Sequence, residues 1–181
     1  MSEEDIKIYS AAPEEPKSGD MEKVLEKMRE HRNNGNIRKA MELGKLLGNM
    51  KFDYEKLVAP KFIKPDILYQ MKALFVFSAE ANLQMFVYDP LLYTTAINAM
   101  YEEIQKNEEG FYKNISDGMA YSFYYSEMKK GGEIEQNIGR SFAMLCSAQQ
   151  NESFAETGTQ LYSLYAETVQ KEIEKTGFRL I

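Results

Sequence analysis

The sequence predicts an all-α protein, because three features of the 181-residue chain point the same way. Apolar residues recur three and four positions apart through most of residues 20–181, and this spacing places them on one face of a helix. Capping residues and helix-starting prolines stand at the ends of these segments. The same part of the chain shows only short, ambiguous strand patterns. We therefore expect about seven helices, joined as antiparallel hairpins into a helical bundle.

The first part of the chain is predicted to hold an acidic tail followed by short helices. Residues 1–19 contain prolines and clustered acids with few large apolar groups, so they are expected to form a flexible acidic tail. Within the tail, Ile6 to Tyr9 alternates like a strand, which is either a local accident or a strand that docks on the sheet edge of a partner. Residues 20–181 are expected to form a single domain. Helices are predicted over residues 20–32 and 37–47, with Asp20 capping the first and Val24, Leu25 and Met28 on one of its faces, and a short helical turn is expected over residues 53–58.

The remaining helices have clearer boundaries. Asp89 is a good cap and Pro90 suits the first helical position, whereas Gly131 and Gly132 suit a helix end. Ser153 begins a capping box. The predicted helices cover residues 65–87, 90–107, 110–130, 133–150 and 153–175.

Two packing expectations follow from residue sizes. Residues 65–87 are apolar on most of their circumference, which predicts a central helix. Two predicted helices carry stripes of small residues, which favour close approach, so we expect them to cross tightly. These stripes are Gly118, Ser122 and Ser126 on one helix, and Gly139, Ala143 and Cys146 on the other.

One short segment resembles a known repeat family. The run Gly35-Asn36-Ile37-Arg38-Lys39-Ala40 resembles the turn and second-helix start of a tetratricopeptide repeat. Aligned on Ala40, this chain has Val24, Lys27, Met28 and His31 where that family has Trp, Leu, Gly and Tyr, and no second copy follows. The resemblance implies helical-hairpin geometry, so a short array of this type is an alternative to the bundle, and it implies no particular function.

Charge and composition exclude several classes of function. Residues 1–20 hold six acids and two lysines, so the other 161 residues carry only −2 of the net charge of −6. This lack of a basic patch argues against a nucleic-acid partner. No apolar run is long enough to span a membrane. An acidic start and one cysteine favour a cytoplasmic protein.

The chain offers little material for catalysis or metal binding. His31 is its one histidine and Cys146 its one cysteine. His31 is expected to be an exposed residue at a helix end, and Cys146 a small packed thiol, unless the fold pairs them as base and nucleophile. No Glu is followed three residues later by Glu, Asp or His, the spacing used by carboxylate-bridged metal bundles. The sequence therefore favours a non-catalytic protein with no cofactor and no metal.

The aromatic residues carry the strongest functional signal. There are 12 Tyr, and Tyr121, Tyr124 and Tyr125 share one helix face. They are either core residues or a binding face for a peptide, a protein partner or a second copy. Glu80 is a carboxylate within the most apolar helix, so it is solvated, structurally paired or part of a functional pocket. The sequence thus predicts an interaction module that binds through a Tyr-rich face, and the alternative is a small-molecule sensor or enzyme with an aromatic pocket near Glu80.

Overall fold

The computed structural model describes residues 18–116 and 119–179, and within these ranges every regular element is a helix. This confirms the all-α class and the helical bundle. The helices are α1 (Ser18–Asn33), α2 (Asn36–Gly48), α3 (Tyr54–Leu57), η1 (Pro60–Phe62, a 3₁₀ turn), α4 (Pro65–Phe86), α5 (Pro90–Asn107), α6 (Glu109–Ser116), α7 (Met119–Lys130), α8 (Ile134–Leu145) and α9 (Glu152–Thr176).

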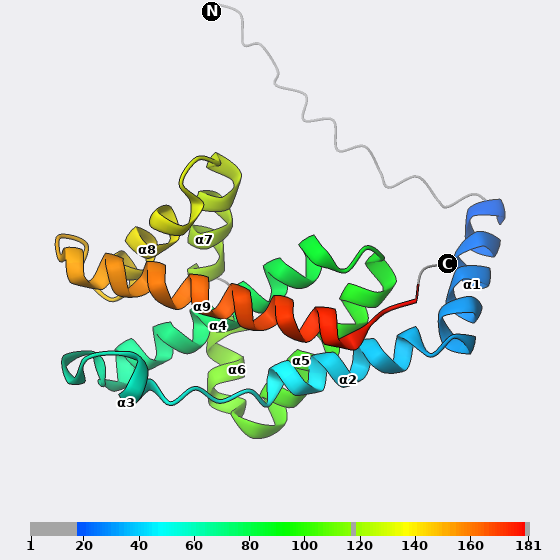
Figure 1. Cartoon of the computed structure of the whole chain (residues 1–181), viewed down its shortest axis with the longest axis horizontal. Coiled ribbons are helices and arrows are strands. Elements are labelled where there is room, and N and C mark those ends of the chain that lie inside the picture. Colours follow the sequence, from blue (N-terminus) through cyan, green and yellow to red (C-terminus); the bar gives the residue numbers. More distant parts are fainter. Residues whose placement is uncertain (1–17, 117–118, 180–181) are drawn as a thin grey trace, which may run out of the picture.

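Helix α4 is the central helix, as its sequence predicts. Met71, Leu74, Phe77 and Leu83 are completely buried along its length. The long helix α9 packs along α4, α8 packs on α9, and α2 packs on α5 (Figure 1). The core therefore lies around α4, and these helices cover it.

Helix boundaries follow local chemistry. The Asp89 carboxylate accepts a hydrogen bond from the backbone N–H of Leu91, and Pro90 opens α5 as predicted. Within the predicted helix 110–130 the structure describes α6 up to Ser116 and α7 from Met119, and residues 117–118 between them lie outside the described residues. At the start of α9 the capping side chain is that of Asn151, two residues before the predicted Ser153.

The close helix crossings differ from the predicted one. Gly139 is buried as expected, but it faces α9, where a Cβ atom would lie 2.4 Å from the carbonyl oxygen of Ala155. On α7, Ser122 and Ser126 are exposed, and Gly118 lies outside the described residues. The prediction of a tight crossing between these two small-residue stripes was therefore wrong, because spacing identifies a small-residue face but not the helix that it meets.

A second close crossing joins α2 to α5. A Cβ atom on Gly44 would lie 2.1 Å from the carbonyl oxygen of Ala96, and one on Gly48 would lie 2.6 Å from that of Met100. Backbone-to-backbone contact of this kind is possible only with glycine at both positions.

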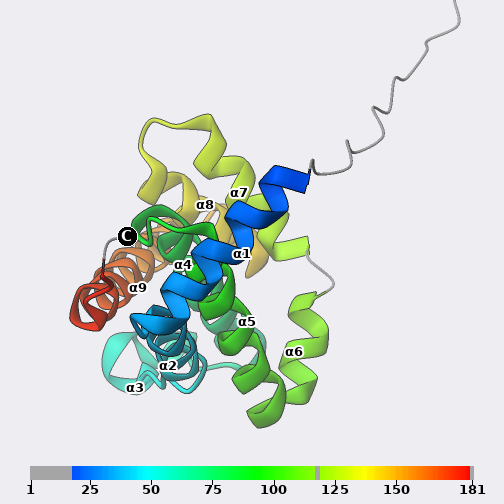
Figure 2. The ribbon, with the colours of Figure 1, turned by 90° about the vertical axis from the view of Figure 1, so that its right-hand side faces the viewer.

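Helix α1 departs from the geometry of a tetratricopeptide hairpin. It stands crosswise to α2 at one end of the molecule and reaches away from the bundle (Figures 1 and 2). Helix α2 packs chiefly on α5, so the first two helices do not form a closely packed antiparallel pair.

The chain before α1 is not described. The predicted acidic tail, residues 1–19, falls almost entirely outside the described residues, and α1 begins at Ser18. No described helix is both long and apolar enough to cross a membrane.

Candidate functional site

Two of the four residues singled out from the sequence meet in the structure. Glu80 on α4 accepts a hydrogen bond from the hydroxyl of Tyr125 on α7, with an O–O distance of 3.1 Å. Its other oxygen accepts one from Tyr101 on α5, at 2.9 Å. Burial, the negative charge of Glu80 and this hydrogen bond raise the pKa of Tyr125 to about 12. Tyr125 is therefore a neutral donor at physiological pH, and the cluster joins three helices, which matches the structural pairing expected for Glu80.

The other two tyrosines do not add to this cluster. Tyr124 is fully buried, and its ring centroid lies 5.0 Å from that of Phe77. Because it is fully buried, the Tyr124 ring belongs to the core. Its hydroxyl has no hydrogen-bond partner among the described residues. The side chain of Tyr121 lies outside the described residues. A binding role for these residues stays a prediction.

His31 is not exposed, so that expectation was wrong. The side chain is completely buried at the end of α1. Its Nε2 lies 3.1 Å from an Asp89 carboxylate oxygen, and its Nδ1 lies 3.1 Å from the side-chain nitrogen of Asn36. The last turn of α1 packs against the α4–α5 connection, so the histidine meets the carboxylate that also caps α5.

The hydrogen bonds of Asn36 determine the tautomer of His31. The side-chain oxygen of Asn36 accepts from the backbone N–H of Arg179 at 2.9 Å, so its NH₂ group must be the donor elsewhere. That group donates to the backbone oxygen of Arg179 and to Nδ1 of His31. Nδ1 is therefore an acceptor, and Nε2 carries the proton that His31 donates to Asp89.

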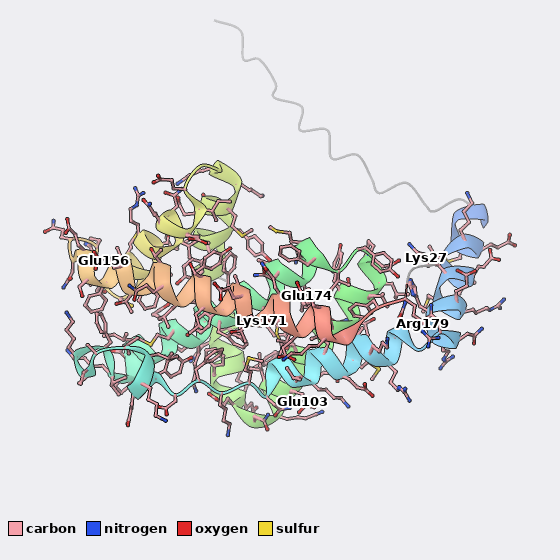
Figure 3. The ribbon with its side chains drawn as sticks, in the orientation of Figure 1. Lys27, Glu103, Glu156, Lys171, Glu174 and Arg179 are labelled. Carbon is pink, nitrogen blue, oxygen red and sulfur yellow. The ribbon has the colours of Figure 1, made fainter. Side chains whose placement is uncertain are left out.

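This network holds α1 and the C-terminal segment to the body. Lys27, four residues before His31, forms an ion pair with Asp89 at 2.7 Å. The hydroxyl of Tyr88 donates to the backbone oxygen of Arg179. Figure 3 shows Lys27 and Arg179 at the same end of the molecule. Burial of Asp89 opposes its ionisation, but hydrogen bonds from Lys27, His31 and the Leu91 N–H lower the pKa of this carboxyl overall.

The rest of α1 carries an exposed apolar face. Met21, Val24, Leu25 and Met28 are 51%, 54%, 47% and 40% exposed. At 100° per residue they fall within an arc of about 100°, which is the width of a face that normally packs on another element. We call these four residues the α1 stripe. Single exposed apolar residues are normal on proteins, whereas these four form one continuous apolar face.

The two borders of the stripe carry opposite net charges. Lys23 and Lys27 lie on one border, and Glu22 and Glu26 lie on the other together with Arg29. All five residues are exposed, and Lys27 is already paired with Asp89. Because the helix carries both signs, it lacks the basic face of membrane-surface helices. Its pattern instead resembles a helix that pairs with another helix.

Catalytic and metal-binding arrangements are not found in the described part of the chain. Both ring nitrogens of His31 have partners, so this residue does not serve Cys146 as a base. Burial raises the pKa of the Cys146 thiol to about 12, so it is not a thiolate at neutral pH. No three His, Cys, Asp or Glu side chains among the described residues are grouped to hold a metal ion.

The sequence indicated parts of this site. The spacing of Val24, Leu25 and Met28 gave the apolar face of α1, and Asp89 was identified as a cap. The link between Asp89 and His31 was missed, because 58 residues separate them and no local pattern marks the contact.

Comparison with known proteins gives no relative for this chain: no family model, no curated protein and no solved structure matches it.

Proposed function

We propose that this chain is a non-catalytic protein-interaction module whose docking surface is the α1 stripe. The observation that carries the proposal is a helix that is anchored at one end by a buried polar network and apolar over the rest of one exposed face. The anchor matters energetically, because a helix that is already formed and oriented loses less conformational entropy when a partner binds.

The charges at the borders of the stripe favour a second copy of α1 as the occupant. In a parallel pair related by a two-fold axis, the basic border of one helix faces the border of the other that holds Glu22, Glu26 and Arg29 and is net negative. In an antiparallel pair, like borders would meet, with Lys23 near lysines and Glu22 near glutamates. The pattern therefore supports a parallel homodimer with the stripe as its seam.

The expected dimer is weak. Sixteen residues of helix span about 24 Å, and one face of that length buries less than the roughly 1,200 Å² of a stable interface. We therefore expect a dissociation constant on the order of micromolar or weaker, so that association depends on protein concentration.

Sedimentation velocity over a concentration series tests the proposal. Wild-type protein should shift from monomer to dimer, and Met28→Glu should remain monomeric because two carboxylates would be buried in the seam. Met144→Glu is the matched control, since Met144 on α8 is 39% exposed against 40% for Met28. A wild-type chain that stays monomeric at hundreds of micromolar would refute self-pairing, as would equal effects of the two substitutions.

Cross-linking tests the orientation. In a Cys146→Ser background, Met21→Cys places two thiols side by side in a parallel pair, within reach of a disulfide. In an antiparallel pair centred on the stripe, the same thiols are separated by about 10 Å along the helices. A covalent dimer is therefore expected on a non-reducing gel. Its absence, together with cross-linking between Met21→Cys and Met28→Cys, would contradict the charge argument.

A further inference from the structure

A pocket of about 250 Å³ opens between α2, α4, α5 and α6, and neither Glu80 nor the α1 stripe lines it. Five segments converge on it: the end of α2, the loop that follows with Tyr54 of α3, the middle of α4, the end of α5, and the start of α6. The lining residues are Leu47, Gly48, Met50, Lys51, Phe52, Tyr54, Lys72, Phe75, Val76, Ile104, Asn107, Glu108 and Phe111.

The inner walls are apolar and largely aromatic. Leu47, Phe75, Val76 and Ile104 are buried core residues. The ring of Phe52 packs edge-on against that of Phe75, with centroids 4.9 Å apart. An engineered apolar cavity of about 150 Å³ is known to accept benzene. A pocket of about 250 Å³ therefore has room for one six-membered ring and a short chain attached to it.

The mouth of the pocket is polar and carries an excess of positive charge. Lys72 forms an ion pair with Glu108, and its ammonium lies 5.7 Å from the ring centroid of Phe111. Lys51 also lines the pocket, and it has no ion-pair partner among the described residues. The charged lining residues are therefore two lysines and one glutamate, and a bound anion would balance the remaining charge.

We propose that this pocket binds a small aromatic carboxylate, with its ring against the wall formed by Phe52 and Phe75 and its carboxylate at Lys51 and Lys72. Apolar walls with a few convergent polar groups are typical of small-molecule sites. The inference goes beyond the interaction through α1 and does not depend on it, because no residue of α1 lines the pocket.

Calorimetric titration with 3-phenylpropionate and with the neutral 3-phenylpropan-1-ol tests both parts of the proposal. The carboxylate should bind with a dissociation constant on the order of 1 mM or below, as expected for a ligand of this size. The alcohol should bind roughly tenfold more weakly because it lacks the charge. Failure of the carboxylate to bind at 10 mM, or equal binding of the two compounds, would overturn the proposal.

Two variants locate the site. Lys51→Glu should weaken binding of the carboxylate roughly tenfold and leave binding of the alcohol unchanged, since only the charge at the rim is altered. Lys129→Glu, which makes the same change at an exposed lysine on α7, should alter neither titration. If Lys51→Glu binds the carboxylate as wild type does, the assignment of the anion site is wrong.

Val76→Phe, which fills the inner end of the pocket, should abolish binding of both compounds. Unaltered binding in a folded Val76→Phe protein would exclude the pocket.

Discussion

Helices α1 and α2 are neighbours in the sequence and are joined by one tight turn, yet they end in opposite environments. Both carry apolar residues at helical spacing. On α2 that face holds Ala40, Leu43 and Gly44, and it is buried against α5. On α1 the face holds only larger side chains, and no described element of the chain covers it.

The two helices end in different environments because the side chains on their apolar faces differ in size. Ala40, Gly44 and Gly48 recur every four residues on α2, so its backbone touches that of α5 at Ala96 and Met100. The methionine, valine and leucine of the α1 stripe instead form a raised ridge, which suits interdigitation with a similar helix. Spacing shows that a helix face is apolar, and residue size indicates whether a flat close contact or a ridge is needed to cover it.

The largest expected effect is that of truncating the buried face of α2. Leu47 is 1% exposed, so Leu47→Ala should lower the free energy of unfolding by about 2–5 kcal/mol through lost burial and a residual cavity. Leu46 is adjacent on the same helix but 44% exposed, so Leu46→Ala should change it by less than about 1 kcal/mol. Urea denaturation of both variants measures this. Equal losses would show that α2 is covered on both faces.

Much of the fold could be predicted from the sequence, because it depends on local chemistry. Asp89 and Pro90 determine the start of α5 from their own side chains, and the apolar circumference of α4 requires a central position. The helix that Gly139 meets was not predicted, since spacing shows which face of a helix is small but not which helix packs against it.

The candidate site was less predictable, because it depends on contacts between distant residues. His31 and Asp89 each have an ordinary local explanation, as a basic residue at a helix end and as a cap. Only the fold brings them together, and the partner of Asn36 is a backbone group 143 residues away. Residue spacing gave the apolar face of α1, but it could not show that no described element covers this face.

The second expected effect concerns the contact between α2 and α5. In Gly44→Ala the new methyl group would overlap the Ala96 carbonyl, so the helices must separate, and overpacking of this kind costs about 1–3 kcal/mol. Gly110→Ala is the control, because a Cβ atom there meets nothing within 4 Å and alanine favours the helix α6. Thermal denaturation should show a lower melting temperature for the first variant only. A neutral Gly44→Ala would mean that α2 and α5 are not in backbone contact.

A smaller effect is expected at the anchor that joins α1 to the body. The pKa of Asp89 is lower in the folded protein than the value of about 3.9 usual for the unfolded chain. Its ionised form therefore adds stability at and above about pH 4, and this contribution is lost as the pH falls through the folded-state pKa. Asp89→Asn keeps a capping side chain but removes the charge, so it should cost about 1 kcal/mol at pH 7.

The pH series provides the control for this variant. The difference between wild type and Asp89→Asn should shrink as the pH falls from about 4 through the lower folded-state pKa, because the wild-type carboxyl is then increasingly protonated. Chemical denaturation at pH 7, 5 and 3 measures the difference. A gap that stays constant from pH 7 to pH 3 would show that the charge of Asp89 does not stabilise the anchor.

The smallest expected effect on stability is at the α1 stripe, and it sharpens the comparison most. Leu25 is 47% exposed, so Leu25→Ala should change the free energy of unfolding by no more than about 0.5 kcal/mol when measured at concentrations where the protein is monomeric. The same substitution should raise the dissociation constant of the dimer about tenfold, because an apolar side chain central to a short seam contributes a large part of its binding energy. Leu46→Ala, similarly exposed on α2 but outside the stripe, should leave the dissociation constant unchanged.

If Leu25→Ala instead lowers the free energy of unfolding of the monomer by about 2 kcal/mol or more, another part of the same chain must cover α1. In that case α1 and α2 would differ only in which part of the chain buries them, and the stripe would no longer be available to a second copy.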